Sequence, residues 1–253
     1  MKTLYYFTSI IFLVLIISCS NTESFDILIK NGQIADGTGK PIFHGDIGIN
    51  ADTIAALGNL ENAKGLKEID ATGLTVAPGF INMLSWANES LIEDGKSQSD
   101  IRQGVTLEVF GEGWSMGPLT EASKKAVQGI GDGNIDYDIT WETLDGYLQF
   151  LEEKGVSPNI ASFIGATTLR INTMGFEDRA PTEEEMEVMK AMVKTAMEEG
   201  AMGIGSSLIY APGFYADTQE LIALCKVASD YDGMYISHMR SEGNQLLESL
   251  DEL

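Results

Sequence analysis

The sequence predicts an α/β fold: a (β/α)8 TIM-type barrel, of which about five strands are present, preceded by a small β-sandwich portion. Two observations lead to this prediction. From residue 73 to residue 253, short apolar runs that end in polar or glycine residues alternate with segments of helical periodicity. Residues 25–72 hold shorter alternating runs separated by turn residues, which is typical of antiparallel strands.

The composition describes an acidic globular protein. Hydrophobic residues make up 44% of the chain, which is enough to form a core, and 38 acidic against 16 basic residues give a net charge of −22. Binding to nucleic acid requires clustered Lys and Arg, so nucleic acid is not an expected partner. The acidity itself indicates a solvated surface.

The first 19 residues have the pattern of a lipoprotein signal peptide. A basic start precedes the apolar run Leu4–Ile17, which is too short to span a bilayer and ends at Ser18-Cys19. A small residue before a cysteine is typical of cleavage with lipid attached to Cys19, so we expect anchoring in a bacterial cell envelope. A plain secretory signal remains an alternative. Cys225 would then have no disulfide partner and would be a small buried hydrophobe.

The segment from residue 25 to 72 predicts a β-sandwich portion. Asn31-Gly32 lies between apolar residues, which is a strong hairpin signal. His44, in a turn over residues 41–45, is expected to be exposed and without a role in the site. Further strands are expected at Asp46–Ile49, Thr53–Leu57 and Glu68–Ile69.

The rest of the chain predicts successive βα units. Helices are expected at Thr140–Gly155, from Pro181 to Gly200 and at Asp217–Tyr231, the last two beginning with capping boxes, and another begins near Asn244. A closed barrel needs eight strands, so we expect the N-terminal portion of a longer protein; a truncated gene product is the alternative. The five expected strands are Leu74–Ile81, Val105–Phe110, Asn159–Gly165, Ala201–Ser206 and Met234–His238.

Two short segments carry a family resemblance. Residues Ala77–Asn82, with the sequence APGFIN, and Gln103–Thr106, with the sequence QGVT, resemble the opening of the barrel in the amidohydrolase superfamily, in particular its N-acyl-D-amino-acid deacylase (D-aminoacylase) branch. The resemblance implies a sandwich shared between the two ends of the chain. Leu84 and Trp86 occupy the positions of that family's two metal-binding histidines, and Ala166 that of another. The sequence therefore departs from the usual binuclear metal set.

Active sites of such barrels form after the C-terminal ends of the strands. His238 lies in a motif, residues 236–243, that resembles one whose histidine binds metal in the deacylase branch. Glu112 lies between two glycines near the position of a metal-binding cysteine in that branch, and a carboxylate is a competent zinc ligand. Hydrogen bonding to a loop amide is the alternative for Glu112. Glu108, within the strand, is a weaker candidate that could point into the barrel.

The loop over residues 207–217 also resembles the corresponding deacylase loop. On that basis Tyr210, through its hydroxyl, and Arg240, as a carboxylate clamp, are candidate substrate contacts. For both residues, packing of the loop is the alternative.

The resemblance implies a metal-dependent amidohydrolase that hydrolyses a non-peptide amide C–N bond of an N-acyl amino acid. We expect one Zn²⁺, held by Glu112, His238 and a histidine beyond Leu253, with the general base also beyond Leu253. The alternatives are a non-catalytic, lipid-anchored binding protein in which Trp86 stacks on a ligand, and an inactive fragment.

Overall fold

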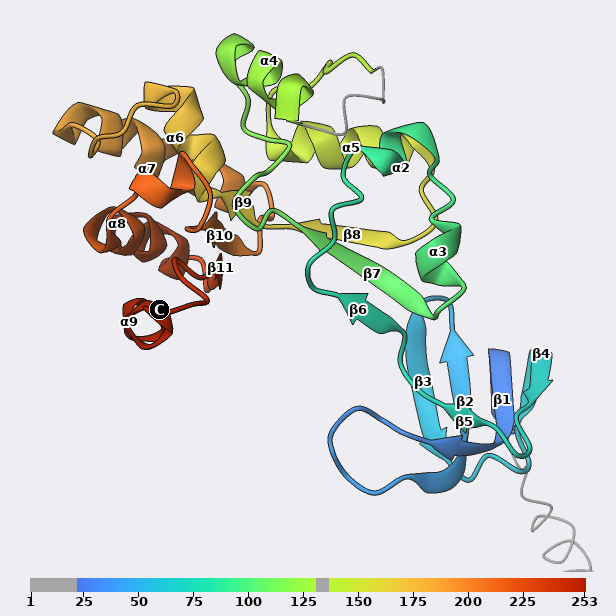
Figure 1. The fold of residues 1–253 in the computed structure, drawn as a ribbon. Coiled ribbons are helices and arrows are strands. Elements are labelled where there is room, and N and C mark those ends of the chain that lie inside the picture. Colours follow the sequence, from blue (N-terminus) through green and yellow to red (C-terminus); the bar gives the residue numbers. More distant parts are fainter. Residues whose placement is uncertain (1–21, 131–136) are drawn as a thin grey trace, which may run out of the picture. The chain divides into compact units, whose positions relative to one another are not determined.

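The computed structural model describes residues 22–130 and 137–253 (Figure 1), and the chain divides into two compact units with the boundary between Pro78 and Gly79. This boundary lies further along the chain than the one expected near residue 72, because a short strand after residue 72 belongs to the first unit. Cys19, the expected site of lipid attachment, lies outside the described residues. Within the described part of the chain, no helix is long and apolar enough to cross a membrane.

The first unit is built on one five-stranded sheet. Its strand order is β3-β2-β1-β4, and β5 pairs with β1. The pairs β1/β2 and β2/β3 are antiparallel, whereas β4 and β5 run parallel to β1. The side chains of Phe25, Leu28 and Ala63 form a small core. The strands are β1 (Ser24–Ile34), β2 (Phe43–Asn50), β3 (Thr53–Gly58), β4 (Lys64–Asp70) and β5 (Thr75–Val76).

The hairpin expected at Asn31-Gly32 is wrong: these residues form a bulge inside β1. Asn31 has a φ of 62°, and the pairing with β2 shifts register between Ile29 and Gly32. The Asn31 amide N–H donates to Asp46 Oδ1 at 2.8 Å, so a side chain of the neighbouring strand satisfies the group that the bulge frees. His44 is exposed as expected, although it lies in strand β2 rather than in a turn.

The second unit contains parallel strands in two connected sheets, β6-β7-β8 and β11-β10-β9. Backbone hydrogen bonds from Phe163 to Phe110 and from Met202 to Ser162 join the two sheets. The described strands thus follow one another in chain order, as expected for successive βα units, and they do not form a closed barrel. Their bounds are β6 (Phe80–Asn82), β7 (Val105–Phe110), β8 (Asn159–Ser162), β9 (Ile164–Gly165), β10 (Gly203–Ser207) and β11 (Met234–His238).

Two of the expected strands are each divided. The run Leu74–Ile81 becomes β5, which pairs with β1 in the first unit, and β6, which pairs with β7 in the second. Pro78 lies between them, and proline cannot donate a hydrogen bond to a sheet ladder. The run Asn159–Gly165 becomes β8 and β9, which pair with different neighbours on either side of the buried Phe163.

Three of the expected long helices are confirmed, with adjusted ends. In α7, Thr182 and Glu185 form the predicted capping box. In α8, Asp217 accepts from the Glu220 amide, but the reciprocal half of the expected box is wrong because the Glu220 side chain pairs with Arg170. The helices are α2 (Ser90–Glu93), α3 (Gln98–Ile101), α4 (Glu121–Ile130), α5 (Leu144–Lys154), α6 (Ala166–Met174), α7 (Glu183–Glu198), the 3-10 helix η1 (Gly213–Tyr215), α8 (Thr218–Ser229) and α9 (Leu246–Glu252).

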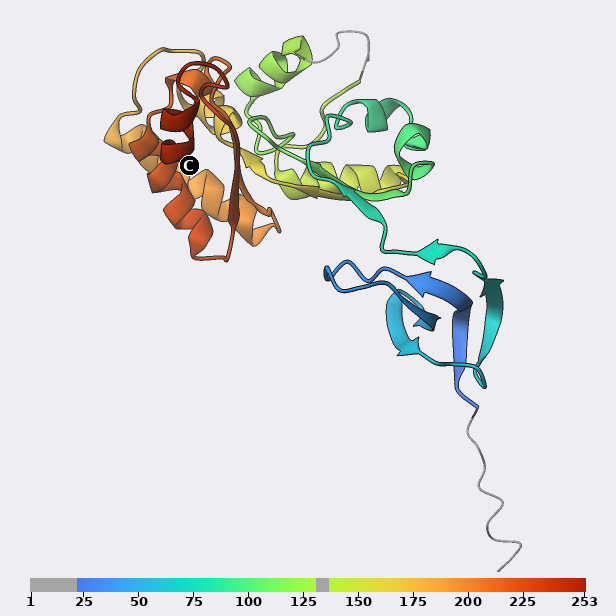
Figure 2. The same cartoon turned by 60° about the horizontal axis from the view of Figure 1, so that its bottom comes forward.

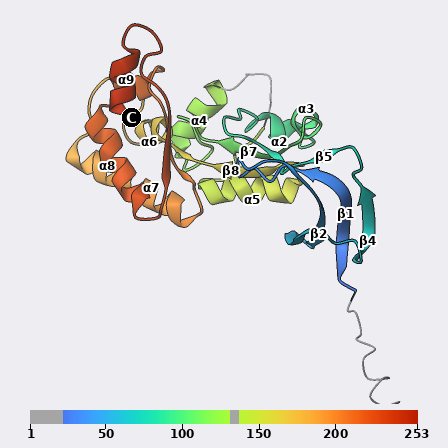
Figure 3. The ribbon, with the colours of Figure 1, turned by 90° about the horizontal axis from the view of Figure 1, so that it is seen from below.

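The helices of the second unit cover its sheets with two apolar clusters. Helices α7 and α8 lie side by side (Figure 2), and α8 lies against β10 and β11. Met189 of α7, Leu224 of α8 and Ile204 of β10 are fully buried in the first of these clusters. Helix α5 lies along β8 (Figure 3), and its Tyr147 packs with Phe110 of β7 in a second cluster. Met189 is therefore a core residue.

Candidate functional site

The loop that follows β7 positions Glu112. Both flanking glycines have left-handed backbone conformations, with φ of 95° at Gly111 and 85° at Gly113. The loop passes so close to β10 that a Cβ added to Gly205 would lie 2.1 Å from the Gly111 carbonyl oxygen. Glycine therefore lets this loop lie against the sheet, and the side chain of Glu112 is only 11% exposed.

His238 is the last residue of β11 and faces Glu112. Its Nδ1 lies 3.8 Å from Glu112 Oε2, and its Nε2 lies 3.3 Å from Glu242 Oε1. Tyr210 approaches the imidazole edge-on, with 5.4 Å between the ring centroids. Burial raises the pKa of Glu112, and the nearby His238 partly opposes that shift. The structure thus brings together two residues that are 126 positions apart in the sequence.

Glu112 and His238 could supply two of the four ligands of a tetrahedral zinc ion. Two donors on a tetrahedral zinc ion lie about 3.4 Å apart, close to the observed separation of 3.8 Å. The described residues contain no group of three or more His, Cys, Asp or Glu side chains able to hold an ion. Leu84 and Trp86 are 47% and 56% exposed and offer no donor, so the residues present fit part of a one-metal set and not a binuclear one.

Arg240, expected as a substrate clamp, is engaged within the protein. Its guanidinium donates to both carboxylate oxygens of Glu252 at 2.8 and 2.9 Å, and to the carbonyl oxygens of Phe214 and Ala216 at 2.7 Å each. These bonds use four of its five N–H groups. The contacts match the alternative in which Arg240 packs the loop. Tyr210 remains 58% exposed beside His238.

Glu108 does not point into the barrel, contrary to one expectation. It is fully buried, and its carboxylate accepts hydrogen bonds from the hydroxyls of Ser85 and Ser97 at 2.6 and 2.7 Å. Phe110, two residues further along the same strand, faces the helices in the second apolar cluster. Glu108 therefore belongs to the side of β7 that the helices cover.

Ala166 has a packing role in this structure. It is the first residue of α6 and is buried in the first apolar cluster. A side chain at this position is surrounded by core residues, so Ala166 contributes nothing to the pair formed by Glu112 and His238.

Sequence reasoning missed two polar residues near the pair. Glu242 follows His238 by four positions, and that spacing within the recognised motif was the available signal. Ser207 pairs in register with His238 in the neighbouring strand, and its buried hydroxyl has no hydrogen-bond partner among the described residues. No sequence pattern singles out Ser207, because its position depends on strand register.

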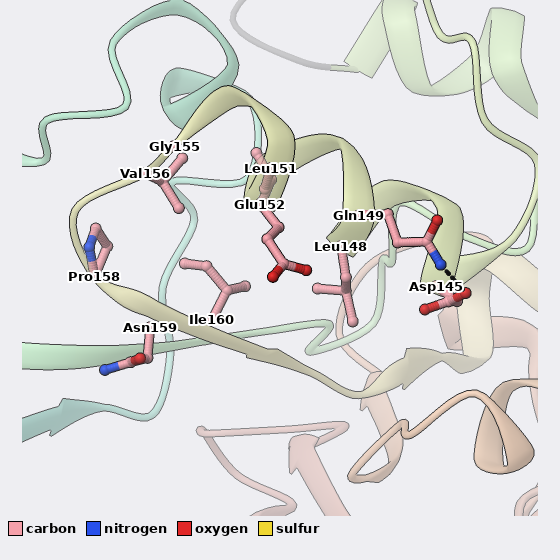
Figure 4. Close-up of a pocket in the computed structure, with 10 residues that line it drawn as sticks. All are labelled: Asp145, Leu148, Gln149, Leu151, Glu152, Gly155, Val156, Pro158, Asn159 and Ile160. Atoms are coloured by element: carbon pink, nitrogen blue, oxygen red, sulfur yellow. Dashed lines mark hydrogen bonds between the residues drawn. The ribbon is translucent and has the colours of Figure 1, made fainter. Parts of the chain in front are cut away.

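A separate pocket lies between α5 and β8 (Figure 4). Its carboxylates come from Asp145 and Glu152 on the helix, and Asp145 accepts a hydrogen bond from Gln149. Its lining includes Asn159, at the start of β8, whereas Glu112 and His238 lie at the C-terminal ends of β7 and β11. This pocket is therefore distinct from the candidate site.

Comparison with known proteins finds similarity to D-aminoacylases. No family model matches the chain. The D-aminoacylase of Alcaligenes xylosoxydans xylosoxydans is 35% identical over 236 residues, which cover 93% of this chain and 48% of that protein. A crystal structure described as D-aminoacylase, defining a novel subset of amidohydrolases, superposes with a TM-score of 0.79 at 32% identity, covering 90% of this chain and 48% of that one. The chain is a homologue of the D-aminoacylases.

A second solved structure agrees with this relationship. The N-acyl-D-glutamate deacylase of Bordetella bronchiseptica, complexed with zinc and a phosphonate inhibitor, superposes with a TM-score of 0.75 at 31% identity. It aligns with 91% of this chain, which covers 48% of its length. The chain thus spans about half the length of the D-aminoacylase homologues that it matches, and it corresponds to their N-terminal part.

Proposed function

We propose that this chain forms part of a metal-dependent amidohydrolase that removes the acyl group from an N-acyl amino acid. The main supporting observation is the pair of Glu112 Oε2 and His238 Nδ1, which lie 3.8 Å apart at the C-terminal ends of strands β7 and β11. Homology to D-aminoacylases and to a zinc-containing N-acyl-D-glutamate deacylase supports the reaction class. The proposal comprises one Zn²⁺, with a further ligand and the general base supplied from beyond Leu253.

The chemistry divides between the metal and the protein. Bound zinc lowers the pKa of a coordinated water and polarises an amide carbonyl. Glu112 and His238 would hold the ion, and Gly111 and Gly113 let the Glu112 loop approach it closely. Tyr210, exposed beside His238, would offer its hydroxyl to the substrate. In this proposal Arg240 shapes the loop by binding the carbonyls of Phe214 and Ala216.

Metal analysis tests the site. The protein purified from its own cells should contain about one zinc per molecule, and Glu112→Ala should lose most of it because one of the donors is removed. Glu153→Ala, which removes an exposed carboxylate from α5, is the matched control and should retain the metal. A folded wild-type protein without metal, or equal zinc in the wild type and Glu112→Ala, would refute the site.

Substrate assays test the reaction. We propose N-acyl-D-amino acids as substrates, because the homologous proteins are named for D-configured substrates. Acetate release should be measured with N-acetyl-D-amino acids carrying neutral and acidic side chains and with their L-enantiomers. Hydrolysis of the D-forms that disappears on chelation and returns with zinc is the expected result. Equal rates with the D- and L-forms would contradict the stereochemical part.

A non-catalytic binding protein is the second candidate. The observation that favours it is the replacement of metal-ligand positions by Leu84 and Trp86, which are exposed and apolar. An indole can stack on a flat or apolar ligand without a metal. This candidate requires that N-acyl amino acids bind to the metal-free protein and quench tryptophan fluorescence, and that Trp86→Ala abolishes binding while no hydrolysis occurs.

We also propose that the protein is anchored to a bacterial envelope through lipid on Cys19. The support is the short apolar run ending at Ser18-Cys19. Intact mass measurement of the membrane fraction should show a lipidated N-terminus at Cys19. Cys19→Ala should move the protein out of the detergent phase, and an unmodified protein in the soluble fraction of wild-type cells would contradict the proposal.

A further inference from the structure

His238 is bracketed by carboxylates on both ring nitrogens. Glu112 faces Nδ1 at 3.8 Å, and Glu242 faces Nε2 at 3.3 Å. We propose that Glu242 is the positioning residue for His238: it accepts the Nε2 proton and so leaves Nδ1 as the free donor atom that faces Glu112. The inference rests on the proposed metal site and identifies the residue that prepares the histidine for it.

Neutral imidazole has one N–H and one lone pair, so only one ring nitrogen can ligate a cation. The proton is retained on the nitrogen with the better acceptor, and the Glu242 oxygen is closer than the Glu112 oxygen by 0.5 Å (3.8 minus 3.3 Å). Metal-binding histidines generally donate their other N–H to such a partner, which fixes the tautomer and the ring orientation. Glu242 Oε1 lies 3.3 Å from Nε2, so Glu242 is the candidate for this partner of His238.

The backbone around Glu242 is held in place by contacts within the chain. The His238 carbonyl accepts from the Leu208 amide at 2.9 Å, which fixes the start of the segment to β10. Arg240, midway between His238 and Glu242, is bound to Glu252 and to two loop carbonyls. The Gly243 amide donates to the hydroxyl of Ser241 at 3.2 Å. These contacts place Glu242 over His238 although its own side chain is 63% exposed.

The alternative interpretation is that Glu242 and His238 form an ordinary surface ion pair that has no effect on the imidazole, since exposed pairs contribute little to stability. The two interpretations differ in a measurable property. A surface pair leaves the imidazole tautomer unchanged when Glu242 is removed, whereas a positioning residue determines that tautomer even when its contribution to the free energy of unfolding is small.

Nitrogen-15 NMR of the full chain measures the tautomer directly, because the sequence contains two histidines, His44 and His238. His44→Ala assigns the remaining ring signals to His238. At about pH 8.5, well above the ordinary histidine pKa, the metal-free protein should show a protonated Nε2 and an unprotonated Nδ1. Glu242→Ala should remove this preference, Glu242→Gln should retain part of it through the amide oxygen, and Glu248→Ala, an exposed carboxylate on α9, should have no effect.

Zinc titration provides the second measurement. Removing an outer-shell partner of a metal ligand typically weakens metal affinity 10- to 100-fold, so Glu242→Ala should weaken zinc binding by about that factor, with Glu242→Gln intermediate. If Glu242→Ala has the wild-type tautomer, the inference is overturned even where zinc binds through Glu112 and His238. If the tautomer depends on Glu242 but the wild type binds no zinc, Glu242 still positions His238 and the proposed metal site fails.

Discussion

The carboxylate of Glu108 accepts a hydrogen bond of 2.6 Å from the hydroxyl of Ser85, 23 positions earlier in the chain. Ser85 lies between Leu84 and Trp86, and its own amide donates to the Val109 carbonyl at 2.9 Å. Ser85 is buried against Glu108, whereas its two neighbours in the chain are exposed. Glu108 thus determines which way the segment presents Leu84 and Trp86.

Glu108→Ala should lower the free energy of unfolding by about 2–4 kcal/mol, because it leaves the buried Ser85 and partly buried Ser97 hydroxyls without their acceptor. Glu108→Gln keeps an acceptor oxygen and should cost less. Urea unfolding followed by circular dichroism measures both. Equal stability of Glu108→Ala and the wild type would show that the two hydroxyls find other partners.

The buried ion pair of Arg170 with Glu220 supports the loop before α7. Both side chains are almost fully buried, and Arg170 also donates to the carbonyl oxygen of Arg179 at 2.7 Å. Glu220→Ala should destabilise the protein by about 3–5 kcal/mol, because it leaves a buried guanidinium without its counter-ion. Arg170→Met combined with Glu220→Leu should recover much of that loss. A double-mutant cycle from urea unfolding gives the coupling energy, and additive effects would contradict the pairing.

Gly113→Ala should destabilise the Glu112 loop for two separable reasons. Its φ of 85° disfavours a side chain, and an added Cβ would lie 2.4 Å from the Cβ of Ser207. The expected loss of stability is about 1–3 kcal/mol, with weaker zinc binding through the displaced Glu112. Adding Ser207→Gly should recover the steric part and leave the backbone part. If the second change recovers nothing, the contact with Ser207 is not the source of the loss.

The capping box of α7 should contribute acid sensitivity. The Arg179 guanidinium, together with the Thr182 backbone and hydroxyl, lowers the pKa of Glu185 from 4.5 to about 2. A carboxyl with a lower pKa in the folded state contributes stability that is complete above about pH 4.5 and is lost as the pH falls toward about 2. Unfolding free energies measured over this range should fall less steeply for Glu185→Gln than for the wild type. Parallel curves would contradict the prediction.

Local chemistry made several elements predictable from the sequence. The capping residues of α7 and the glycine that ends α5 form their hydrogen bonds within one turn of the helix. These sequence patterns therefore predict a helix end without knowledge of the tertiary contacts. The strand Val105–Phe110 was predictable from its apolar run for the same reason. His238 and Glu112 could be proposed because each lies at the C-terminal end of a predicted strand, in a segment that resembles the deacylase branch.

Contacts between residues distant in the chain determined the features that could not be predicted from the sequence. Asn31-Gly32 has the same local preference in a hairpin and in a bulge, and the Asp46 side chain across the sheet selects the bulge. Arg240 would suit a substrate carboxylate until the fold brings Glu252 within 2.8 Å of it. By itself the sequence determined the parallel α/β class, the principal helices and two candidate metal ligands, because periodicity, caps and motifs are local. Only the tertiary structure decided that Glu112, His238 and Glu242 meet, because strand register and loop geometry bring together side chains that are distant in the chain.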